Sequence, residues 1–110
     1  MTTNSWLSTN FERRDSTRQV CHLFATCHPF SDPPKDSFLA IAHDISNDGV
    51  GLWIRQGVAS PTMTVELKDP SGTYSLSKLV RVKHIGQRTV GGIFLKKLSQ
   101  DELEWLLGNE

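Results

Sequence analysis

The sequence has no excess charge of either sign and few aromatic side chains. Twelve basic and twelve acidic residues give a formal net charge of zero. This balance argues against the broad phosphate attraction that drives non-specific DNA binding, so any anion site must be local. A small barrel that binds RNA or single-stranded DNA also needs a basic groove with exposed aromatic residues. The chain has only three tryptophans, one tyrosine and five phenylalanines, so we expect no DNA or RNA partner.

Long apolar runs are also missing. No run approaches the roughly 18 residues needed to cross a bilayer, and residues 1–5 lack the charged and apolar regions of a signal peptide. We therefore expect a cytoplasmic protein with no membrane insertion. A length of 110 residues favours one domain. Because the start of the chain is polar except for Trp6, Leu7 and Phe11, we expect a flexible arm over residues 1–12 and the domain over 13–110.

Cysteine is scarce, and each of the two cysteines is followed by a histidine, as Cys21-His22 and Cys27-His28. This spacing matches none of the usual zinc patterns. In an extended strand the two cysteines share one face and the two histidines the other. We therefore expect cysteines packed in a strand and no metal site. A disulfide within one extended strand is excluded by distance.

The chain offers no arrangement typical of a catalytic site. Its four histidines are scattered over three of the strand-like segments, and no nucleophile, base and orienting group occur in a recognised pattern. His43 precedes Asp44, but consecutive residues of a regular strand point to opposite faces. We expect no enzymatic activity and no cofactor.

Six segments have the composition and the alternation of short strands. Residues 63–68 alternate apolar and polar side chains, and the two prolines in residues 31–36 break the chain between the first two strands. The six segments are residues 17–28, 38–43, 50–54, 63–68, 74–85 and 89–95. Short strands with frequent turns and no helices between them favour a small antiparallel barrel or sandwich.

Only the end of the chain changes character. Residues 99–102 form a capping-box pattern, with Ser99 at the cap and Glu102 three residues later. Leucines follow at helical spacing, and Gly108 can take the left-handed C-terminal conformation. The predicted fold is mainly β, a six-stranded antiparallel barrel with a C-terminal α-helix.

Two polar patches carry the chemistry of the chain. The first is Arg14-Asp15-Ser16-Thr17-Arg18, with Arg13 just ahead of it, and the second is Asp44-Ile45-Ser46-Asn47-Asp48-Gly49. Arginine pairs with phosphate or with the O6/N7 edge of guanine, and a carboxylate accepts from the donors on the opposite edge of guanine. A guanine nucleotide is therefore the natural ligand.

The order RxxxR, strand, loop, strand and DxSxxG closely resembles the PilZ domain, whose signatures are RxxxR and (D/N)xSxxG. The resemblance covers about residues 12–108 and includes Val80-Arg81-Val82 and Val90-Gly91-Gly92-Ile93-Phe94. It implies a PilZ-type barrel and a stand-alone receptor for cyclic di-GMP, a bacterial second messenger. As the chain shows no output domain, the signal would pass to an unidentified downstream effector protein.

The resemblance also implies a role for each residue of the two signatures. Arg14 and Arg18 would bind phosphate or guanine, and Asp44 would accept from guanine N1 and N2. Ser46 would add a hydroxyl contact, and Gly49 would supply backbone freedom and close ligand approach. In PilZ-like sequences an arginine at the position of Arg13 accompanies an intercalated pair of ligand molecules; the alternative is a solvated charge.

Several alternatives remain open at this point. The two RxxxR arginines could form surface ion pairs with Glu12 or Asp15, and Asp44 and Ser46 could shape the hairpin turn, alone or together with ligand binding. We expect Trp53 in the strand core rather than stacked on a base. The alternative function is a PilZ-fold interaction or adaptor protein that does not bind nucleotide.

Overall fold

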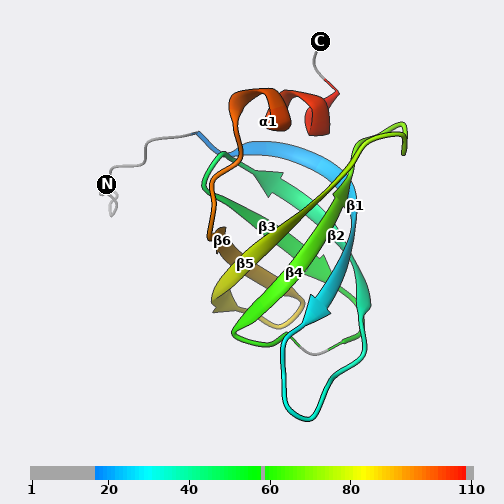
Figure 1. The fold of residues 1–110 in the computed structure, drawn as a ribbon, viewed down its shortest axis with the longest axis vertical. Helices are drawn as coiled ribbons and strands as arrows, with labels where there is room; N and C mark the ends of the chain where they lie inside the picture. The colour runs from blue at the N-terminus through cyan, green and yellow to red at the C-terminus, as the bar shows by residue number, and fades with distance from the viewer. Residues whose placement is uncertain (1–16, 58, 109–110) are drawn as a thin grey trace.

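The structure is a computed structural model that describes residues 17–57 and 59–108 (Figure 1). Each strand end lies within two residues of its predicted position, so the mainly β fold with one C-terminal helix is confirmed. The elements are β1 (Gln19–Pro29), β2 (Phe38–Ile45), β3 (Gly49–Ile54), β4 (Thr62–Lys68), β5 (Ser75–Ile85), β6 (Thr89–Phe94) and α1 (Gln100–Leu107). No helix among these described residues is long and apolar enough to span a membrane.

The six strands form a closed antiparallel barrel in the order β1-β2-β3-β6-β5-β4. Four of the six pairings are hairpins between strands that follow each other in sequence. The other two join strands that are not consecutive. In these, β1 pairs with β4, with Ala25 opposite Leu67, and β3 pairs with β6, with Leu52 opposite Val90. These two pairings join segments far apart in the chain, and closing the barrel leaves no sheet edge open.

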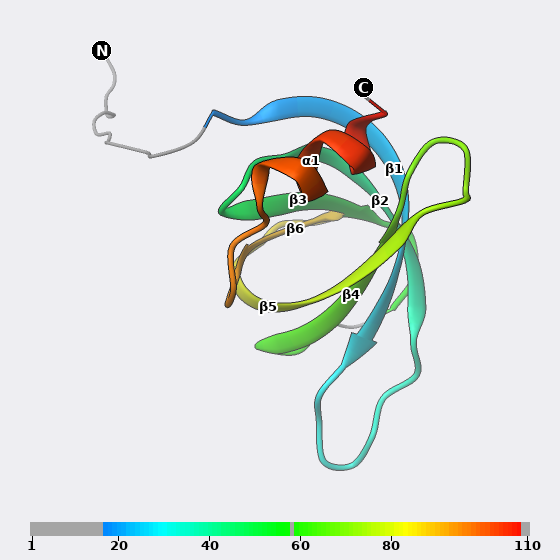
Figure 2. The ribbon, with the colours of Figure 1, turned by 45° about the horizontal axis from the view of Figure 1, so that its top comes forward.

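The interior of the barrel is filled by alternate residues of every strand. On β4, Met63, Val65 and Leu67 are fully buried, as the period-two pattern predicts. One end is covered by α1, which lies across the barrel in both ribbon views (Figures 1 and 2) and buries Leu103 and Leu106. The helix thus completes the core that the strands begin.

The predicted capping box is present at the start of α1. The Glu102 backbone N–H donates to Ser99 Oγ at 3.1 Å, and the Ser99 backbone N–H donates to Glu102 Oε1 at 2.9 Å. Gly108 ends the helix with φ 76°, the left-handed conformation expected there.

The cysteines pack on the strand as predicted. Cys27 is fully buried and Cys21 is half-buried, and both are free thiols. His22 and His28 lie exposed on the opposite face of β1.

The expected place of Trp53 in the core is wrong. Val50 and Leu52 are the inward residues of β3, so the alternation turns Trp53 outward, where it is 52% exposed. Period two separates two faces of a strand but does not say which face is inside when both carry large apolar residues.

Candidate functional site

The turn between β2 and β3 is organised by the buried hydroxyl of Ser46. Ser46 Oγ accepts from the backbone N–H of Asp48 at 3.1 Å and of Gly49 at 3.2 Å. The Ser46 N–H donates to the Gly49 carbonyl at 2.9 Å. The turn-shaping role weighed for Ser46 is therefore present, and its side chain lies inside the hairpin with 1% exposure.

The same turn is fastened to the chain that leads into α1. Asn47 Nδ2 donates to the Leu98 carbonyl at 3.0 Å, and the Leu98 N–H returns a bond to the Asn47 carbonyl at 2.9 Å. Asp48 pairs with Lys97 at 3.2 Å, and its carbonyl accepts from the N–H of Phe94. The second signature therefore lies on a rigid part of the barrel.

Gly49 does not have the positive φ that the expected backbone freedom would use, and a close contact between strands requires glycine here. A Cβ at Gly49 would lie 2.4 Å from the carbonyl oxygen of Gly92, its neighbour across the β3–β6 ladder. Close approach of two strands excludes a side chain here.

Arg18 and Asp44, one from each signature, contact each other. Arg18 lies just before β1 and Asp44 near the end of β2, and Arg18 Nη1 donates to Asp44 Oδ1. Both side chains are about one-third exposed, at 35% and 28%. The structure thus joins the two signatures through one ion pair that remains open to solvent.

His43 lies on the same side of β2 as Asp44, contrary to expectation. The β2–β3 register shifts between Ala42 and Asp44, and this β-bulge breaks the alternation. His43 Nδ1 lies 3.2 Å from Asp44 Oδ2. The inward residues of β2 signal the shift in the sequence: Phe38, Ala40 and Ala42 are followed by Ile45 rather than by residue 44.

The imidazole of His43 is in turn stacked on the indole of Trp53. The ring centroids are 4.8 Å apart and the planes differ by 29°. The sequence analysis predicted neither ring at this site. The position of His43 depends on the bulge in β2, and the position of Trp53 depends on which face of β3 points inward. Together with Arg18 and Asp44 they form a continuous set, which we call the Asp44 cluster.

Two glycines that pair across the β3–β6 ladder lie beside the Asp44 cluster. A Cβ at Gly51 would lie 2.9 Å from both Asp44 Oδ1 and His43 Cε1, so only glycine makes room for these side chains. Gly51 pairs with Gly91, and Gly91 pairs with His84 on β5. A Cβ at Gly91 would make only an ordinary contact, 3.8 Å from the Cβ of His84.

The thiol of Cys21 lies beneath this region. Burial, and then the charge of Asp44, raise the pKa of Cys21 to about 11. The thiol Sγ donates to the Ala42 carbonyl at 3.4 Å. Cys21 is therefore a neutral packing group at neutral pH, not a nucleophile.

Four of the six predicted ligand-binding residues are described by the structure. Arg18 and Asp44 lie together, while Ser46 and Gly49 form the adjoining turn. Arg13 and Arg14 lie outside the described residues.

Comparison with known proteins supports the fold. No family model matches the chain, and no curated protein matches it. Among solved structures, the inhibitor of motility from Bacillus subtilis (MotI/DgrA) matches with a TM-score of 0.66 and 14% identity. The match covers 87% of this chain and 49% of that one, so this chain spans about half the length of MotI/DgrA. At this identity the likeness shows a shared barrel fold.

Proposed function

We propose that this protein is a receptor for cyclic di-GMP that binds its ligand over the Asp44 cluster and passes the signal to a partner protein. The observation that carries the proposal is the contact between Arg18, the second arginine of RxxxR, and Asp44, the first residue of DxSxxG. The role is that of a cytoplasmic binding module, not an enzyme.

The two charges match the two sides of a guanine base. The O6 and N7 atoms of guanine accept hydrogen bonds, which suits Arg18, while N1 and N2 donate, which suits Asp44. Arg18 and Asp44 are paired with each other in the structure. A guanine that replaces this pair offers each side chain a new partner, and its phosphodiester attracts Arg14 or Arg18.

Flat surfaces beside the ion pair support base binding. His43 and Trp53 present stacked rings beside the ion pair. A purine is planar and packs well on an aromatic face. A rigid turn and a charged pair with adjoining flat surfaces are the features that a nucleotide site needs.

A protein partner belongs to the proposal because the resemblance to the PilZ domain implies a receptor that passes its signal to another protein. MotI/DgrA, which shares the barrel, is named for an inhibitory action on motility. For this chain we propose the same general kind of role, in which a small barrel acts on another protein.

The direct test is calorimetric titration of the full chain with cyclic di-GMP, with GMP as the comparison ligand. We expect binding of cyclic di-GMP, and at least tenfold weaker binding in Arg14→Ala, Arg18→Ala and Asp44→Asn. The matched control is Asp36→Asn, which removes an exposed carboxylate in the β1–β2 loop. The absence of heat from the unaltered protein at tens of micromolar contradicts the proposal and favours an adaptor that does not bind nucleotide.

The same titration gives the number of ligand molecules bound. We propose that Arg13 supports an intercalated pair of cyclic di-GMP, so Arg13→Leu should lower the ratio from two ligands to one. An unchanged ratio would mean that Arg13 is a solvated charge that does not support a second ligand molecule.

A further inference from the structure

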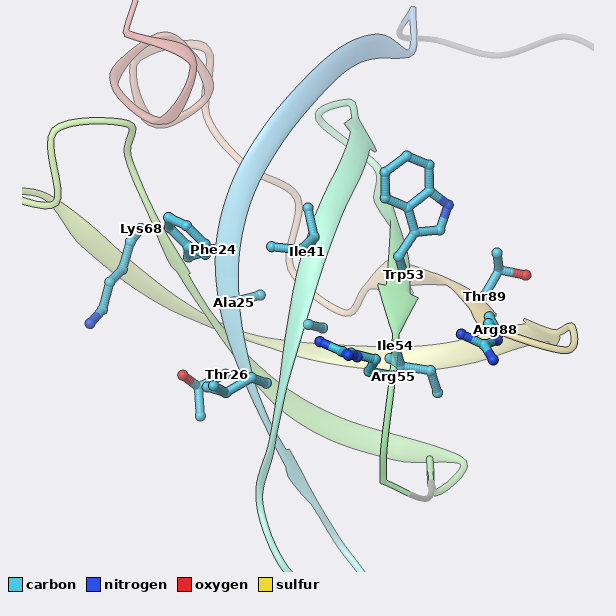
Figure 3. A pocket seen from close by; sticks show the side chains of 12 residues that line it. Phe24, Ala25, Thr26, Ile41, Trp53, Ile54, Arg55, Lys68, Arg88 and Thr89 are labelled. Carbon is cyan, nitrogen blue, oxygen red and sulfur yellow. The ribbon is translucent and has the colours of Figure 1, made fainter.

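A groove runs over the outer face of β1, β2 and β3, next to the Asp44 cluster (Figure 3). Its volume is about 800 Å³. Three large apolar side chains line it and remain exposed to solvent: Phe24 at 64%, Leu39 at 75% and Trp53 at 52%. Such a cluster of exposed apolar side chains on a soluble barrel is typical of a binding surface.

The groove is wide enough for a segment of another protein. Phe24 pairs with Ile41, Ile41 with Trp53 and Trp53 with Thr89, so one row of outward residues crosses four adjacent strands. Three strand spacings of about 4.8 Å make this row roughly 14 Å long. An α-helix with its side chains is about 10–12 Å across.

The charged residues that line the groove have one sign. Arg55, Lys68 and Arg88 line it, and none of its described lining residues is acidic. Two carboxylates lie close to it: Glu66 on β4, which pairs with Thr26 on β1, and Asp44, which is paired with Arg18. Because the whole chain is neutral, three cations around one apolar surface are a local feature.

These cations flank the apolar surface on both sides. Lys68 lies beyond Phe24 and Arg88 lies beyond Trp53 (Figure 3). Arg88 is held beside the end of β3 because its carbonyl accepts from the N–H of Ile54 at 2.9 Å. The arrangement is an apolar centre with a basic rim.

We propose that this groove binds an acidic amphipathic segment of a partner protein. The apolar side chains of the segment pack between Phe24, Leu39 and Trp53, and its carboxylates pair with the rim. An apolar centre supplies most of the affinity of a protein contact, and rim charges select the partner and speed its association. This inference does not depend on nucleotide binding, so failure of the cyclic di-GMP titration leaves it standing.

The test uses two synthetic helical peptides and the full chain labelled with ¹⁵N. Both peptides carry leucine and phenylalanine on one face; the first has glutamates on its flanks and the second has lysines in their place. We expect the acidic peptide to shift the amide signals of the groove-lining residues, and the basic peptide to bind at least tenfold more weakly. Added salt should weaken the acidic complex, because the rim charges are exposed.

Three variants identify the surface. Leu39→Asp places a charge in the groove at an exposed position and should weaken the acidic peptide at least tenfold. Ile85→Asp is the matched control, since Ile85 is 62% exposed on β5 and lies outside the groove. This variant should bind the acidic peptide as tightly as the unaltered protein does. Arg55→Glu combined with Arg88→Glu should reverse the preference toward the basic peptide. If Leu39→Asp fails to fold, Phe24→Asp replaces it.

Several results would overturn the inference. Equal affinity for the two peptides would contradict selection by charge. Amide signal shifts on another face of the barrel would contradict binding in the groove. Binding to phosphatidylglycerol vesicles that Leu39→Asp abolishes, without peptide binding, would assign the groove to a lipid surface. A dimer in sedimentation that Leu39→Asp dissociates would assign it to a second copy of the chain.

Discussion

Gly51 holds the Asp44 cluster in place by having no side chain. The space that a Cβ would fill is taken by the carboxylate of Asp44 and the ring of His43. The effect of a methyl group at this position can therefore be derived from geometry alone.

Gly51→Ala should displace Asp44 and His43, because its new Cβ would lie 2.9 Å from each. Because the atoms that it would meet are the ends of two side chains that can turn away, we expect a loss of at most about 1 kcal/mol in the free energy of unfolding, measured with urea, and weaker cyclic di-GMP binding. Gly91→Ala is the matched control, since its Cβ would meet nothing closer than 3.8 Å and should leave stability nearly unchanged. Equal cyclic di-GMP binding by the two variants would contradict this account.

The signatures of the sequence predicted part of the candidate site for a physical reason. Arg18 and Asp44 are ionised groups with few ways to be satisfied, so their chemistry is visible from residue type alone. The contribution of His43 and Trp53 was not visible from residue type. It depends on the register of β2 and on which face of β3 points toward the core.

The two thiols predict how stability changes at alkaline pH. Burial raises the pKa of Cys27 from its ordinary value of 9.0 to about 12, and burial together with Asp44 raises that of Cys21 to about 11. Above pH 9 the thiols ionise in the unfolded chain but stay protonated in the folded one. Ionisation therefore stabilises the unfolded state, so this contribution to stability is complete below pH 9 and falls as the pH rises toward 11–12.

Urea unfolding between pH 7.5 and 10.5 measures this fall. We expect Cys27→Ala to be less stable than the unaltered protein at neutral pH, because it leaves a small cavity, and to lose less stability as the pH rises. The difference in slope should approach about 1.4 kcal/mol per pH unit at most. Parallel slopes for the two proteins would contradict a buried, protonated Cys27.

Among the elements, the strands were predicted closely and the bulge in β2 was not. Apolar runs between turn residues locate a strand, and capping residues locate the start of α1. A bulge is a property of two strands, because it appears only when one partner has an extra residue. In β2 the bulge is visible as a change of spacing between buried residues: Ala42 is followed by Ile45 instead of residue 44.

The start of α1 provides a test at this scale. Ser99→Ala removes the hydroxyl that accepts from the Glu102 N–H and should lower the free energy of unfolding by about 1 kcal/mol. Thermal unfolding measures the effect. Ser77→Ala is a suitable control, because Ser77 is an exposed residue of β5 without a capping role, and a comparable loss there would show that the cap contributes nothing specific.

At the scale of the whole molecule, the closure of the barrel lies beyond local patterns. The sequence predicts six strands, but the β1–β4 and β3–β6 pairings depend on contacts between residues about 40 apart, such as Ala25 with Leu67 and Leu52 with Val90. The predicted antiparallel barrel is confirmed. Six strands joined by short connections have few other ways to cover their edges.

Shortening the chain separates folding from binding. The described barrel uses no residue before 17, so chains of residues 13–110 and 17–110 should both unfold cooperatively with nearly the same midpoint in urea. Only the longer one keeps Arg13 and Arg14, so only it should bind cyclic di-GMP with full affinity. Loss of the fold in the 13–110 chain would contradict the predicted domain boundary.

The stack of His43 on Trp53 joins the two proposed sites of this barrel. His43 contacts Asp44 on one side, and Trp53 forms a wall of the groove on the other. If nucleotide binding moves this pair of rings, the two equilibria are thermodynamically linked, and the linkage is reciprocal. A partner held in the groove then changes nucleotide affinity by the same factor as nucleotide changes the affinity for the partner, so the abundance of the partner sets the messenger concentration at which the protein responds.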